Sequence, residues 1–145
     1  MAVKMVSKVA LLESNTHANC HNEILVSTIK NDKGHDNELS KEQDLLQPHP
    51  LLLPTLAVSQ DNRLIYQYMP LLEGGDLKSA LNAQKSKCFT LPIAKVYAYQ
   101  VYLALKHLHK TGFLYRDLKP ENVLLSSTGL IKLGDFGFAK RVRSC

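Results

Sequence analysis

The chain has 145 residues, of which 45% are hydrophobic and 21% are charged, with seven glycines and six prolines. This composition is that of one ordinary globular domain, and it excludes a collagen-like or largely disordered polypeptide. The longest apolar runs fall far short of the roughly 18–20 residues needed to cross a bilayer, and the N-terminus has no secretory signal, so we expect no membrane segment and a cytoplasmic or nuclear location.

The formal charge of +5 is concentrated at the C-terminal end. Residues 106–145 carry eight Lys/Arg and three Asp/Glu, whereas residues 1–105 carry ten of each. A basic segment is typical of nucleic-acid binding. Here, however, three of the cations lie in or beside a loop of catalytic residue types, so we expect no nucleic-acid partner. The three cysteines are widely spaced and include no C-x-x-C pair, which predicts reduced thiols.

The first half of the chain is predicted to contain short strands around an inserted segment. Alternating apolar and polar residues predict a strand within residues 1–10. Residues 11–40 are rich in Asn, His, Asp and Ser, which is typical of a loop, with one short ordered element at residues 23–29. A helix and two strands are expected next, at residues 39–47, 52–59 and 64–69.

The second half gives stronger patterns. The clearest is a helix at residues 92–110, where apolar residues recur at spacings of three and four, Pro92 suits the start and Gly112 suits the end. A linker and a short helix are expected before it, at residues 70–76 and 77–83. A short strand and a hairpin are expected after it, at residues 113–115, 123–125 and 130–133.

Residues suited to phosphoryl transfer occur in and after the loop at residues 115–122. Such a transfer needs a carboxylate that accepts the proton of the attacking hydroxyl, ligands for Mg²⁺ and cations near the phosphates. Asp117 and Asn122 lie in this loop, and the hairpin returns the chain so that Asp135 can face Asn122 across a gap suited to a metal. Lys4 supplies another cation; taken alone it is simply a solvated strand residue, and only its combination with these acids favours a catalytic role.

These motifs resemble those of the eukaryotic protein kinases. Residues 115–122 match the catalytic-loop pattern of that family, residues 135–137 match its Asp-Phe-Gly motif, and residues 2–4 match its Val-Ala-x-Lys strand. Tyrosine at position 115 and the run after Asp135 resemble the AGC group. The resemblance implies the α+β, two-lobed protein kinase fold, in incomplete form. Residues 1–69 would form part of the N-lobe (strand 3, an insertion, the C-helix and strands 4 and 5), and residues 70–145 the hinge and part of the C-lobe.

The resemblance also implies catalytic roles and two cofactors, ATP and Mg²⁺. Lys4 would hold the α- and β-phosphates of ATP. Asp117 would be the catalytic base, and Lys119 would contact the γ-phosphate and favour serine/threonine over tyrosine specificity. Asn122 and Asp135 would bind Mg²⁺.

A nucleotide pocket is implied by further matches. Tyr66 would be the gatekeeper, and Ala2 and Leu124 would enclose the adenine from its two faces. Main-chain groups at the hinge would bind the adenine edge, from Gln67, Tyr68 and Met69.

Two acidic residues are implied in recognition as well. Asp76 would reach the ribose. Asp76 and Glu121 also match the positions with which AGC kinases recognise an arginine before the target residue, so the expected partner is a protein substrate with a basic recognition sequence.

The carboxylate partner of Lys4 has two candidates. Glu42 is favoured, because the residues after it and the following His49-Pro50 resemble the C-helix and its exit. Glu23 lies at a conventional distance from Lys4 in the sequence, but no His-Pro pair follows it closely.

The resemblance covers about half of a typical kinase domain. A glycine-rich loop before Lys4 and an Ala-Pro-Glu motif after Cys145 are not in the sequence. We therefore expect a fragment of a longer serine/threonine kinase or, alternatively, a truncated and catalytically inactive chain that acts as a binding or scaffold module.

Overall fold

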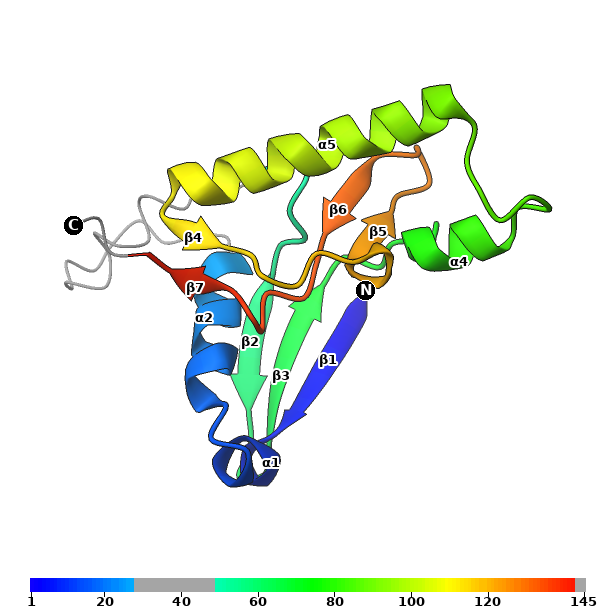
Figure 1. Ribbon diagram of the computed structural model, residues 1–145. Coiled ribbons are helices and arrows are strands. Elements are labelled where there is room, and N and C mark those ends of the chain that lie inside the picture. Colours follow the sequence, from blue (N-terminus) through cyan, green and yellow to red (C-terminus); the bar gives the residue numbers. More distant parts are fainter. Residues whose placement is uncertain (28–48, 143–145) are drawn as a thin grey trace.

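The computed structural model describes residues 1–27 and 49–142 of the chain. Figure 1 shows a small three-stranded sheet and, next to it, several short strands beneath a long helix. The sheet contains β1 (Ala2–Ser7), β3 (Leu64–Met69) and β2 (Ala57–Gln60) in that order, with both neighbouring pairs antiparallel. Strands were expected at these places, but β1 ends earlier than residue 10.

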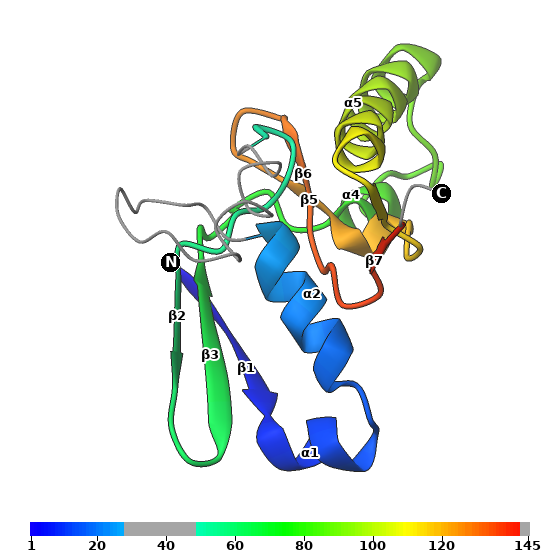
Figure 2. The ribbon, with the colours of Figure 1, turned by 90° about the vertical axis from the view of Figure 1, so that its left-hand side faces the viewer.

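Two helices follow β1 directly. The hydroxyl of Ser7 accepts a hydrogen bond from the backbone N–H of Ala10 and caps α1 (Lys8–Glu13), and α2 (His17–Ser27) then runs beside the sheet (Figure 2). The expectation of a loop is therefore wrong for residues 11–13 and 17–22, and the short ordered element expected at residues 23–29 is, as far as Ser27, the end of α2. The helical pattern is faint in the sequence because α1 buries no residue and α2 buries as many polar as apolar residues. The helix expected at residues 39–47 lies outside the described residues.

The strand expected at residues 52–59 is divided between two partners. The backbone N–H of Leu133 donates to the carbonyl of Leu51 at 2.8 Å, and the N–H of Leu53 donates to the carbonyl of Leu133 at 2.9 Å. Only from Ala57 does the chain pair with β3 as β2. The segment thus connects the three-stranded sheet to the hairpin region.

The rest of the chain confirms the predicted elements within one or two residues. These elements are α4 (Leu77–Asn82), α5 (Leu91–Lys110), β4 (Phe113–Leu114), β5 (Val123–Leu125) and β6 (Ile131–Leu133), and β7 (Lys140–Arg141) pairs with β4. Thr90 and Pro92 begin α5, and Gly112, with φ of +80°, follows its end. Among the described residues, no helix combines the length and the apolar character needed to span a membrane.

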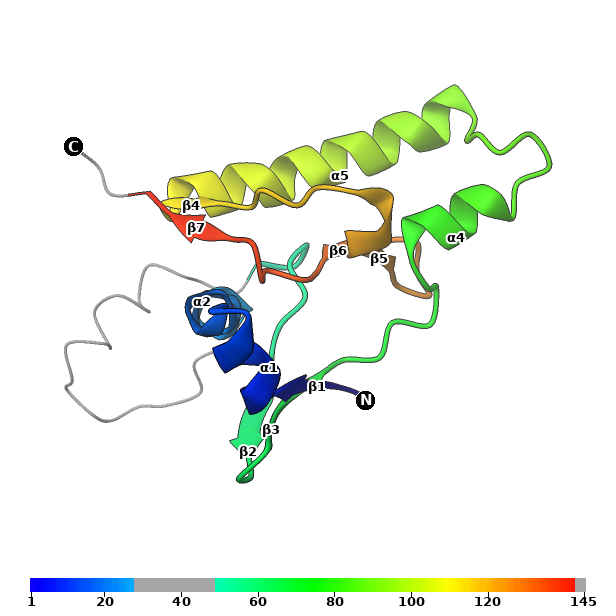
Figure 3. The same ribbon diagram turned by 60° about the horizontal axis from the view of Figure 1, so that its bottom comes forward.

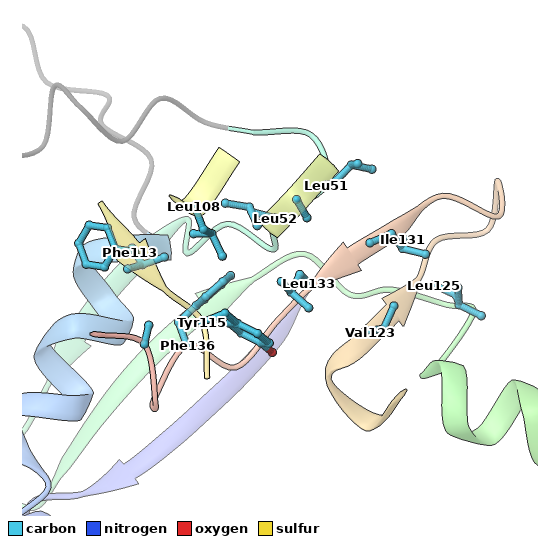
Figure 4. Packing of buried hydrophobic residues seen from close by; sticks show 13 residues of the cluster. Leu51, Leu52, Leu108, Phe113, Tyr115, Val123, Leu125, Ile131, Leu133 and Phe136 are labelled. Carbon is cyan, nitrogen blue, oxygen red and sulfur yellow. The ribbon is translucent and has the colours of Figure 1, made fainter. Parts of the chain in front are cut away.

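The apolar core lies between α5, the β5–β6 hairpin and the loops around them. Figure 4 shows its side chains converging from these elements, and Figure 3 shows α5 along the same side of the hairpin. Leu108, Ile131 and Leu133 are fully buried. The side-chain oxygen of Gln100 on α5 accepts a hydrogen bond from the backbone N–H of Ile131 at 2.9 Å and fixes the helix to β6. The loops on either side of the hairpin are therefore held on a rigid support.

Candidate active site

Lys4 lies at the centre of a group of charged side chains. It stands opposite Gln67 in the β1–β3 pair, and its Nζ lies 2.5 Å from Glu23 Oε1 and 3.2 Å from Asp135 Oδ1. Burial lowers the pKa of Lys4, but the hydrogen bond to Glu23 and the charges of Glu23 and Asp135 outweigh this, so its pKa is raised overall. Lys4 therefore joins β1, α2 and the segment after β6 as a cation.

The partner of Lys4 is Glu23, which the sequence analysis ranked second. Glu42, the favoured candidate, lies outside the described residues. Glu23 reaches Lys4 because α2 follows β1 after a short helix and turn, and the helix presents this carboxylate, which is 7% exposed, to the sheet. The preference for Glu42 rested on the His49-Pro50 pair that follows it. The sequence indicated only a short ordered element beginning at Glu23, not the longer helix α2 that carries this residue.

The loop after β4 brings together three of the expected catalytic residues. Asp117 Oδ2 accepts hydrogen bonds from Lys119 Nζ and from Asn122 Nδ2, both at 2.8 Å. The hydrogen bond from Lys119 lowers the pKa of the Asp117 carboxyl, with a further contribution from Asn122, and the same contact raises the pKa of Lys119. The carboxylate is ionised at neutral pH and held in one orientation.

Hydrogen bonds to the segment after β6 hold the start of this loop in place. The buried hydroxyl of Tyr115 donates to the carbonyl of Gly134 at 2.5 Å, and Arg116 Nε donates to the carbonyl of Phe138 at 2.8 Å. Arg116 and Asp135 both have positive φ angles, of 64° and 51°, which non-glycine residues seldom adopt. Such backbone conformations occur where surrounding contacts impose them, as at functional sites.

A cavity of about 280 Å³ opens between the sheet, α2 and the hairpin. Lys4, Glu23 and Asp135 line it, and of the three residues brought together in the loop after β4 only Asn122 does. Four further residues implied in nucleotide binding or substrate recognition line it: Gln67, Met69, Glu121 and Leu124. The cavity therefore brings residues of the sheet and α2 together with residues of the hairpin and of the segments beside it.

Several implied residues do not line this cavity. Among them are Ala2, Asp76, Asp117 and Lys119. Asp76 caps α4, because its carboxylate accepts hydrogen bonds from the backbone N–H and the hydroxyl of Ser79 at 2.8 Å each. The hydroxyl of Tyr66 donates to Asp61 in the β2–β3 turn, while its neighbour Gln67 lines the cavity. Because strand side chains alternate between faces, Tyr66 and Gln67 lie on opposite faces of the sheet, and the gatekeeper role of Tyr66 stays a prediction.

The oxygen atoms on the inner side of the hairpin fit a magnesium ion. Asn122 and Asp135 both border the cavity, and the N–H of Gly134 donates to the carbonyl of Asn122 at 2.9 Å, which holds the two side chains near one another. One carboxylate and one amide oxygen are ligands of the kind that Mg²⁺ uses together with phosphate oxygens and water. The described residues contain no cluster of three or more His, Cys, Asp or Glu side chains that could hold a metal by themselves.

Sequence reasoning missed several residues of the cavity wall. Ser27 and Thr55 are buried polar residues, and Leu53 adds apolar surface. Ser27 was missed because α2 was not recognised. The others have no local signal, since only the folding of the chain brings them to the cavity.

Comparison with known proteins agrees with this geometry. The protein kinase domain model matches residues 1–145. The chain belongs to the protein kinase domain family. It has the sheet, helices and loops of an incomplete two-lobed kinase fold.

Its relatives include several cAMP-dependent protein kinases. The chain is 48% identical over 94 residues to cAMP-dependent protein kinase type 3 of Saccharomyces cerevisiae, covering 65% of the chain and 23% of that protein. It is 48% identical over 103 residues to a cAMP-dependent protein kinase catalytic subunit of Arthrobotrys oligospora, covering 70% and 20%. A catalytic subunit-like protein of Caenorhabditis elegans is 41% identical over 105 residues, covering 72% and 26%.

These matches confirm the resemblance to the AGC kinases. The kinase chain described here spans about a fifth to a quarter of the length of these three relatives.

Proposed function

We propose that the chain forms part of a serine/threonine protein kinase that uses ATP and Mg²⁺ and transfers the γ-phosphoryl group to a protein hydroxyl. The observation that carries this proposal is the position of Lys4 Nζ, within 3.2 Å of both Glu23 and Asp135 on a cavity that Asn122 also lines. A cation and oxygen ligands on one cavity are what the phosphates of a bound nucleotide and their metal ion require.

Asp117 is the proposed catalytic base. Lys119 and Asn122 orient its carboxylate, and its lowered pKa keeps it ionised at neutral pH, so it can accept a hydrogen bond and then the proton from the attacking hydroxyl. A carboxylate with a lowered pKa is a weak base. Orientation of the hydroxyl is therefore its larger contribution.

Lys4 is the proposed ligand of the α- and β-phosphates. Glu23 holds its ammonium group, and the raised pKa keeps Lys4 protonated at neutral pH. Asn122 and Asp135 would hold Mg²⁺, which when bound neutralises charge on the phosphates. Lys119, next to Asp117, would contact the γ-phosphate.

The proposed boundary between the two lobes lies between residues 69 and 70, with Lys4 and Glu23 on its N-terminal side and Asp117, Asn122 and Asp135 on its C-terminal side. β3 ends at Met69, and the following segment lies against β5, because the N–H of Gly74 donates to the carbonyl of Leu125 at 3.0 Å. A Cβ atom at Gly74 would lie 2.6 Å from that carbonyl oxygen, so only glycine allows this approach. We propose that residues 1–69 belong to the N-lobe and residues 70–145 to the hinge and C-lobe.

The proposed protein substrate has a basic residue before its target hydroxyl. Glu121 lines the cavity near the catalytic loop and supplies a negative charge there. Asp76, the second acidic residue expected in recognition, is engaged in capping α4. Glu121→Gln should therefore raise KM for an arginine-containing serine peptide several-fold with little change in kcat, whereas an equal effect on a peptide without arginine would contradict this role.

Transfer of labelled phosphate from [γ-³²P]ATP to such a peptide tests the proposed activity. Asp117→Ala should lower turnover by about 10² to 10⁴, the contribution of a positioned general base. Glu13→Gln, which removes an exposed carboxylate at the end of α1, is the matched control and should leave turnover unchanged. Full activity of Asp117→Ala would refute the assignment, and little nucleotide binding by the wild-type protein, with no transfer, would favour the catalytically inactive binding or scaffold module.

A further inference from the structure

The inner face of α2 is unusually polar for a helix that positions a functional side chain. Its four buried residues are Cys20, Glu23, Val26 and Ser27, so half of them carry polar groups. A helix that packs against a sheet is normally held by an apolar stripe. With the partly buried Leu25, these two apolar side chains form a small stripe, and hydrogen bonds add to it in the C-terminal half of the helix, which carries Glu23.

Hydrogen bonds from Thr55 supply these contacts. The backbone N–H of Thr55 donates to the carbonyl of Ser27 at 2.6 Å, and the hydroxyl groups of the two residues lie 2.6 Å apart. The hydroxyl of Ser27 in turn donates to the carbonyl of Glu23 at 2.7 Å. Because a serine hydroxyl has one hydrogen, Thr55 must be the donor within the hydroxyl pair. A chain of hydrogen bonds thus runs from Thr55 through Ser27 to the backbone of Glu23.

The backbone around Thr55 is held in place by hydrogen bonds to strands on both sides. Its neighbour Leu56 donates its N–H to the carbonyl of Tyr68 at 2.7 Å, and Leu53 is bonded to Leu133 of β6. Thr55 itself is only 2% exposed. A segment that is bonded to strands on both sides moves little. The hydrogen bonds between Thr55 and Ser27 therefore fix α2 relative to these strands.

We propose that Thr55 and Ser27 are positioning residues that hold Glu23 against Lys4. Their hydrogen bonds end on the backbone of the same residue whose carboxylate meets Lys4 Nζ. Loss of the Thr55 hydroxyl leaves only its backbone N–H bonded to Ser27, so the end of α2 becomes more mobile and the contact of Glu23 with Lys4 weakens. The proposal rests on the proposed function in so far as Lys4 binds a nucleotide.

Hydrogen exchange measures the anchoring of α2 without reference to any ligand. Thr55→Val keeps the shape of the side chain and removes the hydroxyl, and it should speed exchange of the α2 amides about two- to tenfold, the effect of losing one buried hydrogen bond. Exchange in α5 should stay unchanged. Thr55→Ser retains the donor and should behave as wild type. Thr128→Val, which removes the hydroxyl paired with Ser126 in the β5–β6 turn, is the matched control.

A double-mutant cycle shows whether Thr55 acts through Glu23. Thr55→Val should weaken Mg²⁺–ATP binding several-fold in the wild-type protein and have no further effect when Glu23→Gln is already present. The proposal is overturned if Thr55→Val leaves α2 exchange unchanged, if it speeds exchange in α2 and α5 equally, or if its effect on ATP binding is the same in both backgrounds. If the wild-type protein binds no nucleotide, the proposed function fails, and the exchange experiment alone decides whether Thr55 anchors α2.

Discussion

Two regions of the molecule are stabilised by different kinds of contact. In the helix–hairpin region, residues 91–136, apolar side chains such as Leu108, Ile131 and Leu133 are fully buried. In the sheet–α2 region, residues 1–27 and 55–69, β2 is exposed along its whole length, and several of the most buried residues are polar. The loop at residues 115–122 thus rests on apolar packing, whereas the position of Lys4 depends on hydrogen bonds and ion pairs.

The difference predicts where the molecule tolerates change. Apolar packing is non-directional and costs most when volume is lost, whereas a polar contact fails when one of its partners is removed. Substitutions that delete methyl groups should be costly in the helix–hairpin region. Substitutions that delete a single donor should matter most in the sheet–α2 region.

The largest expected effect is that of Leu133→Ala. This residue is fully buried at the centre of the core, so its truncation should lower the free energy of unfolding by about 2–5 kcal/mol. Val58→Ala in β2, where the side chain is 42% exposed, should change it by less than about 0.5 kcal/mol. Urea unfolding of the two variants measures both values, and similar losses would show that the two regions do not differ in packing.

Tyr115→Phe should have the next largest effect. It removes the buried hydroxyl that donates to the carbonyl of Gly134 and leaves that carbonyl without its partner, at a cost of about 1–3 kcal/mol. Tyr99→Phe on α5 removes a hydroxyl from a side chain that is 62% exposed and serves as the control. Thermal unfolding should show a lower Tm for the first variant alone; equal Tm values would mean that the Tyr115 hydroxyl contributes nothing to stability.

Gln67→Met should have a smaller effect of opposite sign. Gln67 is 1% exposed, and its buried Nε2 has no hydrogen-bond partner among the described residues. An apolar side chain of similar length avoids this unpaired donor and should raise the free energy of unfolding by about 1 kcal/mol. Gln60→Met, at an exposed position of β2, should leave it unchanged. A lower stability for Gln67→Met would show that the amide makes contacts that stabilise the sheet–α2 region.

The smallest expected effect is the contribution of His49, in the segment that connects the two regions, to the pH dependence of the free energy of unfolding. Burial lowers its pKa below the ordinary value of 6.5, with further contributions from the nearby charges of His107 and Lys132. The folded state therefore favours neutral His49, and the unfolded state takes up the proton first as the pH falls. Stability that is fully present above about pH 6.5 should decrease as the pH falls through 6.5 toward the folded pKa.

His49→Phe tests this prediction, since phenylalanine can stack on His107, as His49 does at 4.5 Å, but cannot titrate. Its free energy of unfolding, measured between pH 5 and 8, should vary less with pH than that of the wild type. Val58→Ala, at an exposed position of β2, should retain the wild-type slope. An unchanged slope in His49→Phe would assign the pH dependence to other groups.

The sequence predicted the elements of the helix–hairpin region well. The periodic apolar residues of α5, its end signals and the turn of the β5–β6 hairpin are local patterns, and they form the elements that those patterns indicate. Asp117, Lys119 and Asn122 are close in the sequence, so one loop suffices to bring them together. Two of the three family motifs, at residues 115–122 and 135–137, lie in or at the end of this region, and the third, at residues 2–4, lies in β1.

The sheet–α2 region was predicted less well. Only the tertiary structure showed that Glu23 meets Lys4, that Gln67 rather than Tyr66 lines the cavity, and that Ser27 lies against Thr55. Sequence alone determined the elements whose signals are local, because turn chemistry and side-chain periodicity act within a few residues. Tertiary structure decided the partners of buried polar groups, because these depend on strand register and on a helix whose own apolar pattern is weak.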